Sequence, residues 1–217
     1  MLALIDYGSG NIRSVFKALQ HEGADVRLIG TPEGLAEASA VVLPGVGAFA
    51  DCVDGIASRG LWEPLQNWLH SGRPFLGICV GYQMLFEGSE EAPETVRGFG
   101  FFAGKVRRFQ TPNLKIPQIG WNKLTLTPHP LWDGLPVNPH VYFVHSYHPD
   151  PVDSAETIAT CEYGVPFAAA SARGNVIGTQ FHPEKSQEVG LRILRNFLKI
   201  AAKNRAYHQR RCEDENS

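Results

Sequence analysis

The stretch PFLGICVGYQMLF, residues 74–86, changes its hydrophobic pattern halfway along. Residues 74–78 form a continuous apolar run, which is typical of a strand that is buried on both faces of a sheet. The residues after Gly81 are good helix formers, so the stretch predicts a strand, a sharp turn and a helix. Cys79 stands at the predicted turn, with Gly77 and Gly81 two residues away on either side. A thiol at this point needs a structural or a chemical reason.

Strands and helices alternate through the residues that precede this stretch. Helical spacing follows Asn11 and ends at Gly23, and a broken helical pattern covers residues 48–70. Short apolar runs, each closed by Gly or Pro, predict three further strands. Alternating strands and helices with fully apolar strands indicate a parallel sheet that helices cover on both faces. The three apolar runs lie at 2–6, 26–29 and 40–43.

The second half of the chain has glycines and aromatic residues between short β-like segments. We expect these segments to add antiparallel strands, so the predicted fold class is α/β with a mixed central sheet. A helical pattern returns at 187–206, whereas residues 207–217 are polar and predict a frayed tail. The chain therefore reads as one domain over residues 1–206, followed by a tail. The β-like segments lie at 102–109, 121–126, 139–147, 157–163, 166–172 and 175–181.

The composition narrows the classes of partner. The 20 Lys and Arg residues nearly balance the 22 Asp and Glu residues, and the formal charge of −2 argues against nucleic acid or an anionic membrane. No apolar run approaches the ~18 residues of a transmembrane helix, and the N-terminus lacks the basic start of a signal peptide. The four cysteines are too scattered for a disulfide framework. We expect a soluble, unprocessed protein of the cytoplasm.

Cys79 has the surroundings of a nucleophile on a strand-to-helix turn. Such an elbow needs small residues on both sides because the two backbones nearly touch, and Gly77 and Gly81 meet that need. The sulfur would sit at a helix N-terminus, where the dipole and the free N–H groups favour the thiolate. The alternative is an ordinary buried cysteine, since cysteine is among the most buried residue types. A nucleophile also needs a base and an oxyanion site.

A candidate base occurs far downstream, in the stretch GTQFHPEKS at residues 178–186. His182 and Glu184 are two residues apart, a spacing that puts both side chains on one face of an extended segment. The carboxylate could then hold one imidazole nitrogen while the other faces the sulfur, as in a catalytic triad. A surface His and Glu at the start of a loop is the alternative. A zinc deaminase site is disfavoured because the P-C-x-x-C half of its motif is absent.

A glycine-rich stretch, LPGVGAF at residues 43–49, follows another predicted strand. Gly45 and Gly47 would let the backbone turn its N–H groups towards a ligand, as an oxyanion hole requires. A strand-to-helix turn without chemistry is the alternative. Neither His145 nor His148 has partners at a metal-ligand spacing, so we expect no metal and no cofactor.

Together, P-G-V-G near residue 45, G-x-C-x-G-x-Q near residue 79 and H-P-E near residue 182 resemble the class I, or triad, glutamine amidotransferases. The resemblance covers nearly the whole chain. It implies a flavodoxin-like sheet and hydrolysis of the side-chain amide of L-glutamine, with the ammonia passed to a synthase partner. It also implies that Cys79 is the nucleophile, that His182 is the general base and acid, and that Glu184 orients the imidazole.

Within that family, the chain is similar to the glutaminase subunits of imidazole glycerol phosphate synthase. This resemblance is carried by IDYGSGNIRSV at 5–15, PQIGWN at 117–122, YFVHSY at 142–147, and the KS that follows H-P-E. It implies histidine biosynthesis and a heterodimer with a (β/α)8-barrel cyclase, which makes imidazole glycerol phosphate and an aminoimidazole carboxamide ribotide. The alternatives are a glutaminase subunit for chorismate amination or vitamin B6 synthesis, an inactive regulatory subunit, and a general thiol hydrolase.

The same resemblance implies roles for further residues and a peptide rotation at residues 45–47 before the oxyanion donor is presented. The isolated subunit would then be a poor glutaminase. Tyr82 and Gln118 depart from the family pattern, where methionine or a small or apolar residue is more frequent. Without the resemblance, the two aromatic residues named below would be core residues and the lysine a solvated charge. The implied oxyanion hole is Val46, Gly47 and Val80; the implied substrate grip is Gly45, Gln83, Ser146 and Tyr147; the implied face towards the cyclase is Asn11, Trp121, Tyr142 and Lys185.

Overall fold

A computed structural model describes residues 1–8 and 10–214 of the chain. Its centre is an eight-stranded sheet with the order β2-β1-β3-β4-β12-β11-β10-β7. Strands β1, β3 and β4 are buried along their whole length, as their continuous apolar runs predict. Strand β12 is equally buried, but it pairs with β4 in parallel, so the expectation of an antiparallel strand is wrong for the segment at 175–181. The strand bounds are β1 Leu2–Ile5, β2 Val26–Ile29, β3 Ala40–Leu43, β4 Phe75–Ile78, β7 Thr125–Leu126, β10 Thr157–Glu162, β11 Pro166–Arg173 and β12 Val176–Thr179.

The sheet is mixed, which confirms the predicted fold class. From β2 to β12 the neighbouring strands run parallel, and β11, β10 and β7 then continue the sheet with antiparallel pairs. The order β2-β1-β3-β4 followed by one more parallel strand is that of a flavodoxin-like doubly wound sheet. In such sheets, ligands bind beyond the carboxyl ends of the strands.

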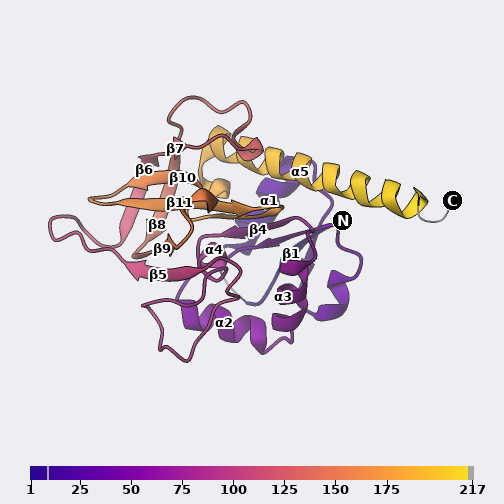
Figure 1. The fold of residues 1–217 in the computed structure, drawn as a ribbon, viewed down its shortest axis with the longest axis horizontal. Coiled ribbons are helices and arrows are strands. Elements are labelled where there is room, and N and C mark those ends of the chain that lie inside the picture. Colours follow the sequence, from indigo (N-terminus) through magenta and orange to yellow (C-terminus); the bar gives the residue numbers. More distant parts are fainter. Residues whose placement is uncertain (9, 215–217) are drawn as a thin grey trace.

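Helices cover both faces of the sheet. Figure 1 shows α1 and α5 on one side of the strands, and α2 and α3 on the other. A buried apolar cluster runs through both layers, from Leu4 of β1 to Phe197 of α5. Among the described residues, none of the helices is long and apolar enough to cross a membrane. The helix bounds are α1 Ile12–His21, α2 Phe49–Ala57, α3 Trp62–His70, α4 Val80–Gln83 and α5 Gln187–Asp214, with short 3₁₀ turns at Pro32–Leu35, Pro130–Trp132, Ser154–Glu156 and Pro183–Lys185.

Two antiparallel pairs lie beside the central sheet. The pair β5–β9 joins Gly104–Arg108 to Tyr147–Pro151, and the pair β6–β8 joins Gln118–Lys123 to His140–His145. Figure 1 shows both pairs at the end of the molecule away from the projecting end of α5. These pairs contain the β-like segments that the sequence predicts at 102–109 and 139–147 and the first part of the segment at 121–126, whose end is β7. The expectation that these segments join the central sheet is wrong for the two pairs, which form separate sheets.

Two predicted helices have different lengths in the structure. The helix after Cys79 is a single turn, α4, because the carbonyl oxygens of residues 84–87 accept hydrogen bonds of 2.7–3.2 Å from N–H groups of residues 98–102. A single turn has little macrodipole, so the helix-terminus argument for a Cys79 thiolate loses its basis. The last helix, α5, continues through Asp214 instead of fraying after residue 206. Its final residues include Gln, Arg and Glu without Gly or Pro, a composition that permits helix; residues 215–217 lie outside the described part.

Candidate active site

Three parallel strands bring the sequence motifs to one edge of the sheet. Strand β4 lies between β3 and β12, and all three end at that edge. The chain leaves β3 into the glycine-rich residues 44–47, leaves β4 into Cys79, and leaves β12 towards His182. The register that pairs Ile78 with Thr179 extends one step further, since Cys79 N–H donates to the Thr179 carbonyl at 2.8 Å. Motifs that are 100 residues apart in the chain thus become neighbours.

Cys79 occupies a strained elbow. Its backbone has φ 56° and ψ −110°, a conformation that L residues rarely adopt, and its side chain is buried. A Cβ at Gly81 would lie 2.0 Å from the Leu43 carbonyl oxygen, and one at Gly77 would lie 2.6 Å from the Gly81 oxygen. The two glycines are therefore required by backbone contact, as the elbow interpretation predicts.

His182 and Glu184 form a buried pair. Nδ1 of His182 lies 2.7 Å from Oε1 of Glu184, and both side chains are shielded from solvent. The Asn11 side-chain amide donates to the same carboxylate oxygen at 2.6 Å, so the carboxylate is fixed from two sides. The expected extended geometry is wrong, because Pro183–Lys185 is a 3₁₀ turn that begins four residues after the last residue of β12. Pro183 cannot donate a ladder hydrogen bond, which is consistent with the strand ending before it.

The charge state of His182 depends on its two neighbours. Burial alone lowers the pKa of His182, but the Cys79 and Glu184 side chains raise it, with a net result of about 10. Because Glu184 holds Nδ1, the buried Nε2 is the nitrogen that can exchange a proton with the Cys79 sulfur. At neutral pH the His182 imidazole is therefore protonated and can donate a proton through Nε2.

The backbone around Gly45 holds a closed arrangement. The Val80 N–H donates to the Gly45 carbonyl oxygen at 3.4 Å, so one expected oxyanion donor is occupied by the chain itself. The next carbonyl, that of Val46, accepts from the Cys52 thiol at 3.6 Å. Gly47 has φ +94°, a backbone conformation that glycine adopts readily and that residues with a side chain rarely adopt.

A cavity of about 240 Å³ opens onto the sulfur and the imidazole. It brings together most of the residues that the resemblance implies for the oxyanion hole and for the substrate grip. Gly45 is the exception, because it is not among the lining residues; its carbonyl oxygen accepts from the Val80 N–H. The cavity is lined by Val46, Gly47, Cys79, Val80, Gln83, Glu91, Pro117, Val144, His145, Ser146, Tyr147 and His182.

A second histidine in the wall of the cavity is not a competing base. Burial lowers the pKa of His145 to about 3, so its imidazole is neutral. Its Nδ1 lies 2.7 Å from the Tyr147 carbonyl oxygen and therefore carries the proton that makes this hydrogen bond. Burial lowers the pKa of both histidines, but only His182 has the Cys79 and Glu184 side chains to offset it, so the two histidines differ in charge.

The sequence analysis missed two polar residues of the site, one in the cavity lining and one behind Cys79. Glu91 lines the cavity, and its carboxylate also accepts from the Phe49 N–H at the start of α2, at 2.9 Å. Gln180 is fully buried, and its side-chain amide lies 3.7 Å from the Cys79 sulfur. Glu91 stands in a segment without periodic pattern, so no sequence signal marks it. Gln180 stands two residues before His182, but no sequence signal shows that it would lie next to Cys79.

The four residues expected to face a cyclase do not all lie on the same surface. Asn11 points inward to Glu184, whereas Trp121, Tyr142 and Lys185 form a surface cluster on the β6–β8 pair and the turn after His182, in which Tyr142 is half-buried. The Trp121 and Tyr142 rings meet edge to face with centroids 6.1 Å apart, and the Lys185 ammonium lies 5.8 Å from the Tyr142 ring. Trp121 is 46% exposed, so the alternative of core aromatics is wrong for this residue.

The sequence matches the family model of the class-I glutamine amidotransferases over residues 3–201. The chain belongs to this family. Among the relatives of this amidotransferase, imidazole glycerol phosphate synthase subunit HisH from Syntrophotalea carbinolica is 48% identical, over 91% of this chain and 98% of that protein. The subunit of the same name from Trichodesmium erythraeum is 49% identical, over 94% of this chain and 97% of that protein. The resemblance found in the motifs is confirmed.

Solved amidotransferase structures share the fold at much lower identity. PurLQS from Thermotoga maritima superposes with a TM-score of 0.74 at 19% identity, covering 91% of this chain and 97% of that one. A structure described as glutamine amidotransferase gives a TM-score of 0.73 at 21% identity, covering 92% and 98% of the two chains. At such identities the likeness concerns the fold alone.

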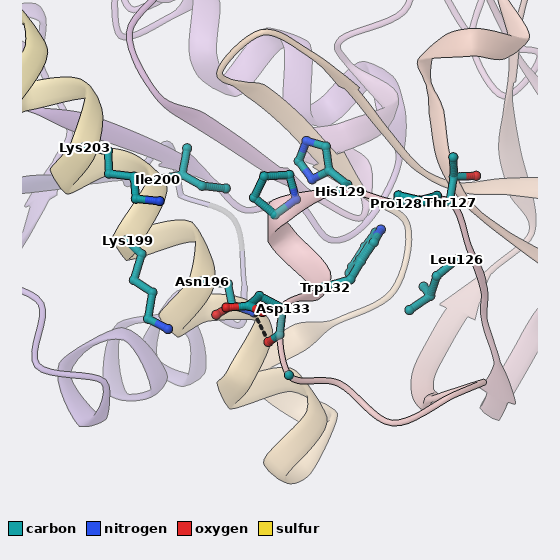
Figure 2. A pocket seen from close by; sticks show the side chains of 12 residues that line it. Leu126, Thr127, Pro128, His129, Trp132, Asp133, Asn196, Lys199, Ile200 and Lys203 are labelled. Carbon is teal, nitrogen blue, oxygen red and sulfur yellow. Dashed lines mark hydrogen bonds between the residues drawn. The ribbon is translucent and has the colours of Figure 1, made fainter.

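The amidotransferase has a larger hollow that is a poor candidate for the same chemistry. This hollow, of about 650 Å³, lies between α5 and the segment around η2 (Pro130–Trp132), as Figure 2 shows. Its histidine, His129, already accepts the Leu131 N–H at 3.1 Å, and Asn196 is held by the carbonyl of Asp133 at 2.8 Å. No cysteine is among the residues that line it. The smaller cavity therefore remains the candidate active site.

Proposed function

We propose that this chain hydrolyses L-glutamine to glutamate and ammonia and passes the ammonia to the cyclase subunit of an imidazole glycerol phosphate synthase. The cyclase, a (β/α)8-barrel, would form imidazole glycerol phosphate and an aminoimidazole carboxamide ribotide in histidine biosynthesis in the cytoplasm. One observation carries the proposal. The buried Cys79 elbow lies beside the His182–Glu184 pair in a chain that is 48–49% identical to HisH subunits over nearly their whole length.

In the first half of the reaction the Cys79 thiolate attacks the carbonyl carbon of the glutamine side-chain amide. The C–O π electrons move onto oxygen, and the resulting oxyanion needs backbone N–H donors. His182 donates its Nε2 proton to the amide nitrogen, the C–N bond breaks, and ammonia leaves a γ-glutamyl thioester on Cys79. Glu184 and Asn11 support this step because they keep the ring oriented while its charge changes.

In the second half water hydrolyses the thioester. His182, now neutral, takes a proton from the water as its oxygen attacks the acyl carbon. The C–S bond then breaks, and the thiolate and the imidazolium are restored together with the carboxylic acid of glutamate. The product acid and ammonia account for the atoms of glutamine and water.

The closed backbone at Gly45 supports a gated enzyme. The Val80 N–H cannot stabilise an oxyanion while it donates to the Gly45 carbonyl. Rotation of the peptide between Gly45 and Val46 would remove that carbonyl and turn the Val46 N–H towards the cavity. Gly45 tolerates such a rotation because it has no side chain. We therefore expect slow glutamine hydrolysis until the partner favours the rotated peptide.

The cavity wall suits the polar ends of a glutamine molecule. The Gln83 side-chain N–H₂ group donates to the Tyr147 carbonyl oxygen at 3.0 Å and to Gln180 Oε1 at 3.1 Å. The side-chain carbonyl oxygen of Gln83 is left to accept from the substrate. The Glu91 carboxylate would attract the α-ammonium group of glutamine. Ser146 would contribute a further polar contact from the strand connection between β8 and β9.

The β6–β8 pair links this cavity to the surface cluster. Pro117, just before β6, and Val144 of β8 line the cavity, while Trp121 and Tyr142 of the same pair are register partners at the surface. A partner that covers the cluster of Trp121, Tyr142 and Lys185 would therefore sit next to the site where ammonia is released. This arrangement favours direct transfer of ammonia to the partner over its release into solvent.

The test of the proposed function is glutamate release by the purified chain, alone and with the barrel cyclase and its nucleotide substrate. A low basal rate that rises by about 10²-fold or more in the complex is the expected result, since an occupied oxyanion donor costs about that factor. A high rate without partner, or no increase with this cyclase while an electrophilic glutamine analogue still labels Cys79, would contradict the assignment to this synthase.

Lys185→Ala is expected to weaken the complex and to lower the stimulation by the cyclase. The lysine is exposed, lies on the Tyr142 ring and is next to Glu184 in the chain, so it suits contact with a partner. Loss of such an interface contact costs about 1 kcal/mol or more, roughly a fivefold change in Kd. Titration of the cyclase against glutamate release measures both effects. Lys199→Ala, an exposed lysine on α5, is the matched control, and equal behaviour of the two variants would exclude the interface role.

A further inference from the structure

Gln180 is a polar side chain in the core that none of the assigned roles explains. It follows β12 directly, and the parallel register of β12 with β4 places it opposite Cys79. Its backbone N–H donates to the Ala169 carbonyl at 2.8 Å, and no part of the residue is exposed. A buried amide is costly unless both of its ends have partners, so its contacts show what it does.

Both ends of this amide contact the candidate site. The Nε2 group donates to the Cys79 sulfur over 3.7 Å, and the Oε1 atom accepts from Gln83 Nε2 at 3.1 Å. The second N–H of Gln83 goes to the Tyr147 carbonyl at 3.0 Å. This chain of hydrogen bonds permits one orientation for each amide, because an acceptor must face each N–H.

We propose that Gln180 is a positioning residue that holds the Cys79 thiolate with a neutral N–H donor and fixes the Gln83 amide with its carbonyl. The proposal deepens the proposed function, on which its second half rests. An amide N–H stabilises the sulfur anion without a proton to lose, so the thiolate stays poised while His182 changes charge. The carbonyl of Gln180 keeps the carbonyl of Gln83 turned away from itself and towards the cavity, since two carbonyl oxygens repel.

The test compares wild type with Gln180→Met, which has similar size but neither the donor nor the acceptor. The first readout is the pH dependence of Cys79 alkylation by iodoacetamide, followed by mass spectrometry of the Cys79 peptide. We expect the midpoint of this profile to rise by about one pH unit, since a charge-assisted hydrogen bond to the thiolate is lost. The second readout is the KM for glutamine in the cyclase complex, which we expect to rise by about tenfold as Gln83 loses its fixed orientation.

Gln180→Asn provides a second variant if the methionine variant does not fold, because its shorter amide cannot span from Gln83 to the sulfur. Thr179→Val, at the buried last residue of β12 and next to Gln180 in the chain, controls for general disturbance of β12 and is expected to leave the alkylation midpoint in place. Folded Gln180 variants with a wild-type midpoint and a wild-type KM would overturn the proposal. Alkylation of Cys79 does not depend on glutamine hydrolysis. A shifted midpoint in a protein that hydrolyses no glutamine would therefore contradict the proposed function but support the contact of Gln180 with the Cys79 thiolate.

Discussion

Cys79→Ala lowers glutamine hydrolysis by the cyclase complex by about 10⁴-fold or more, the scale expected when a covalent nucleophile is removed. Among the cysteines whose side chains the structure describes, no other thiol can replace Cys79. The side chains of Cys52 and Cys161 are buried, burial raises the pKa of both, and neither is among the residues that line the cavity. Glutamate release in the presence of the cyclase and its nucleotide is the measurement.

The control for this variant is ammonia itself. If the chain only supplies ammonia, a complex that carries Cys79→Ala should still form the cyclase products when an ammonium salt is added. His182→Ala should fall in the same range because nucleophile and base act as one unit, whereas Glu184→Gln should retain more activity. Cys161→Ala tests for indirect effects of losing a buried thiol. Normal glutamate release by Cys79→Ala would remove the acyl-transfer mechanism.

The elements of the first half of the fold could be predicted because each has a strong local pattern. The apolar runs of β1, β3 and β4 are short and uninterrupted, and β2 contains one polar residue, Arg27, so the bounds of all four agree with the structure to within one or two residues. The prediction that Cys79 and His182 share one site came from their motifs, because hydrophobic periodicity alone does not tell which strands are neighbours. Insertion of β12 beside β4 is a tertiary event that involves strands about 100 residues apart.

The details that could not be predicted are those that depend on contacts between distant backbones. The single turn of α4 ends because residues 98–102 return to bond with the carbonyls of residues 84–87, and the local sequence favours a longer helix. The ring of Tyr82 packs against Gly178, where an added Cβ would lie 1.9 Å from it. The larger aromatic residue at position 82 is thus matched by a glycine in β12, and no single-sequence pattern reveals this pairing.

Gly81→Ala is expected to destabilise the protein and to disable Cys79 together. The added methyl carbon would lie 2.0 Å from the backbone oxygen of Leu43, which cannot move without shifting β3 against β4. Overpacking of this kind costs about 1–3 kcal/mol in the free energy of unfolding. The same displacement moves the Gly45 carbonyl and the Val80 N–H, so we expect glutamine hydrolysis in the complex to fall by about 10²-fold. Urea unfolding and glutamate release measure the two effects.

Gly88→Ala is the matched control, because a Cβ there would meet its nearest neighbour, the Val96 carbonyl oxygen, at an ordinary contact distance of 3.6 Å. Any gain from reduced freedom of the unfolded chain should be similar for both variants. The difference between them therefore isolates the contact of Gly81 with β3. If the two variants unfold at the same urea concentration and release glutamate equally fast, the elbow tolerates a side chain, and the explanation of the G-x-C-x-G motif by backbone crowding fails.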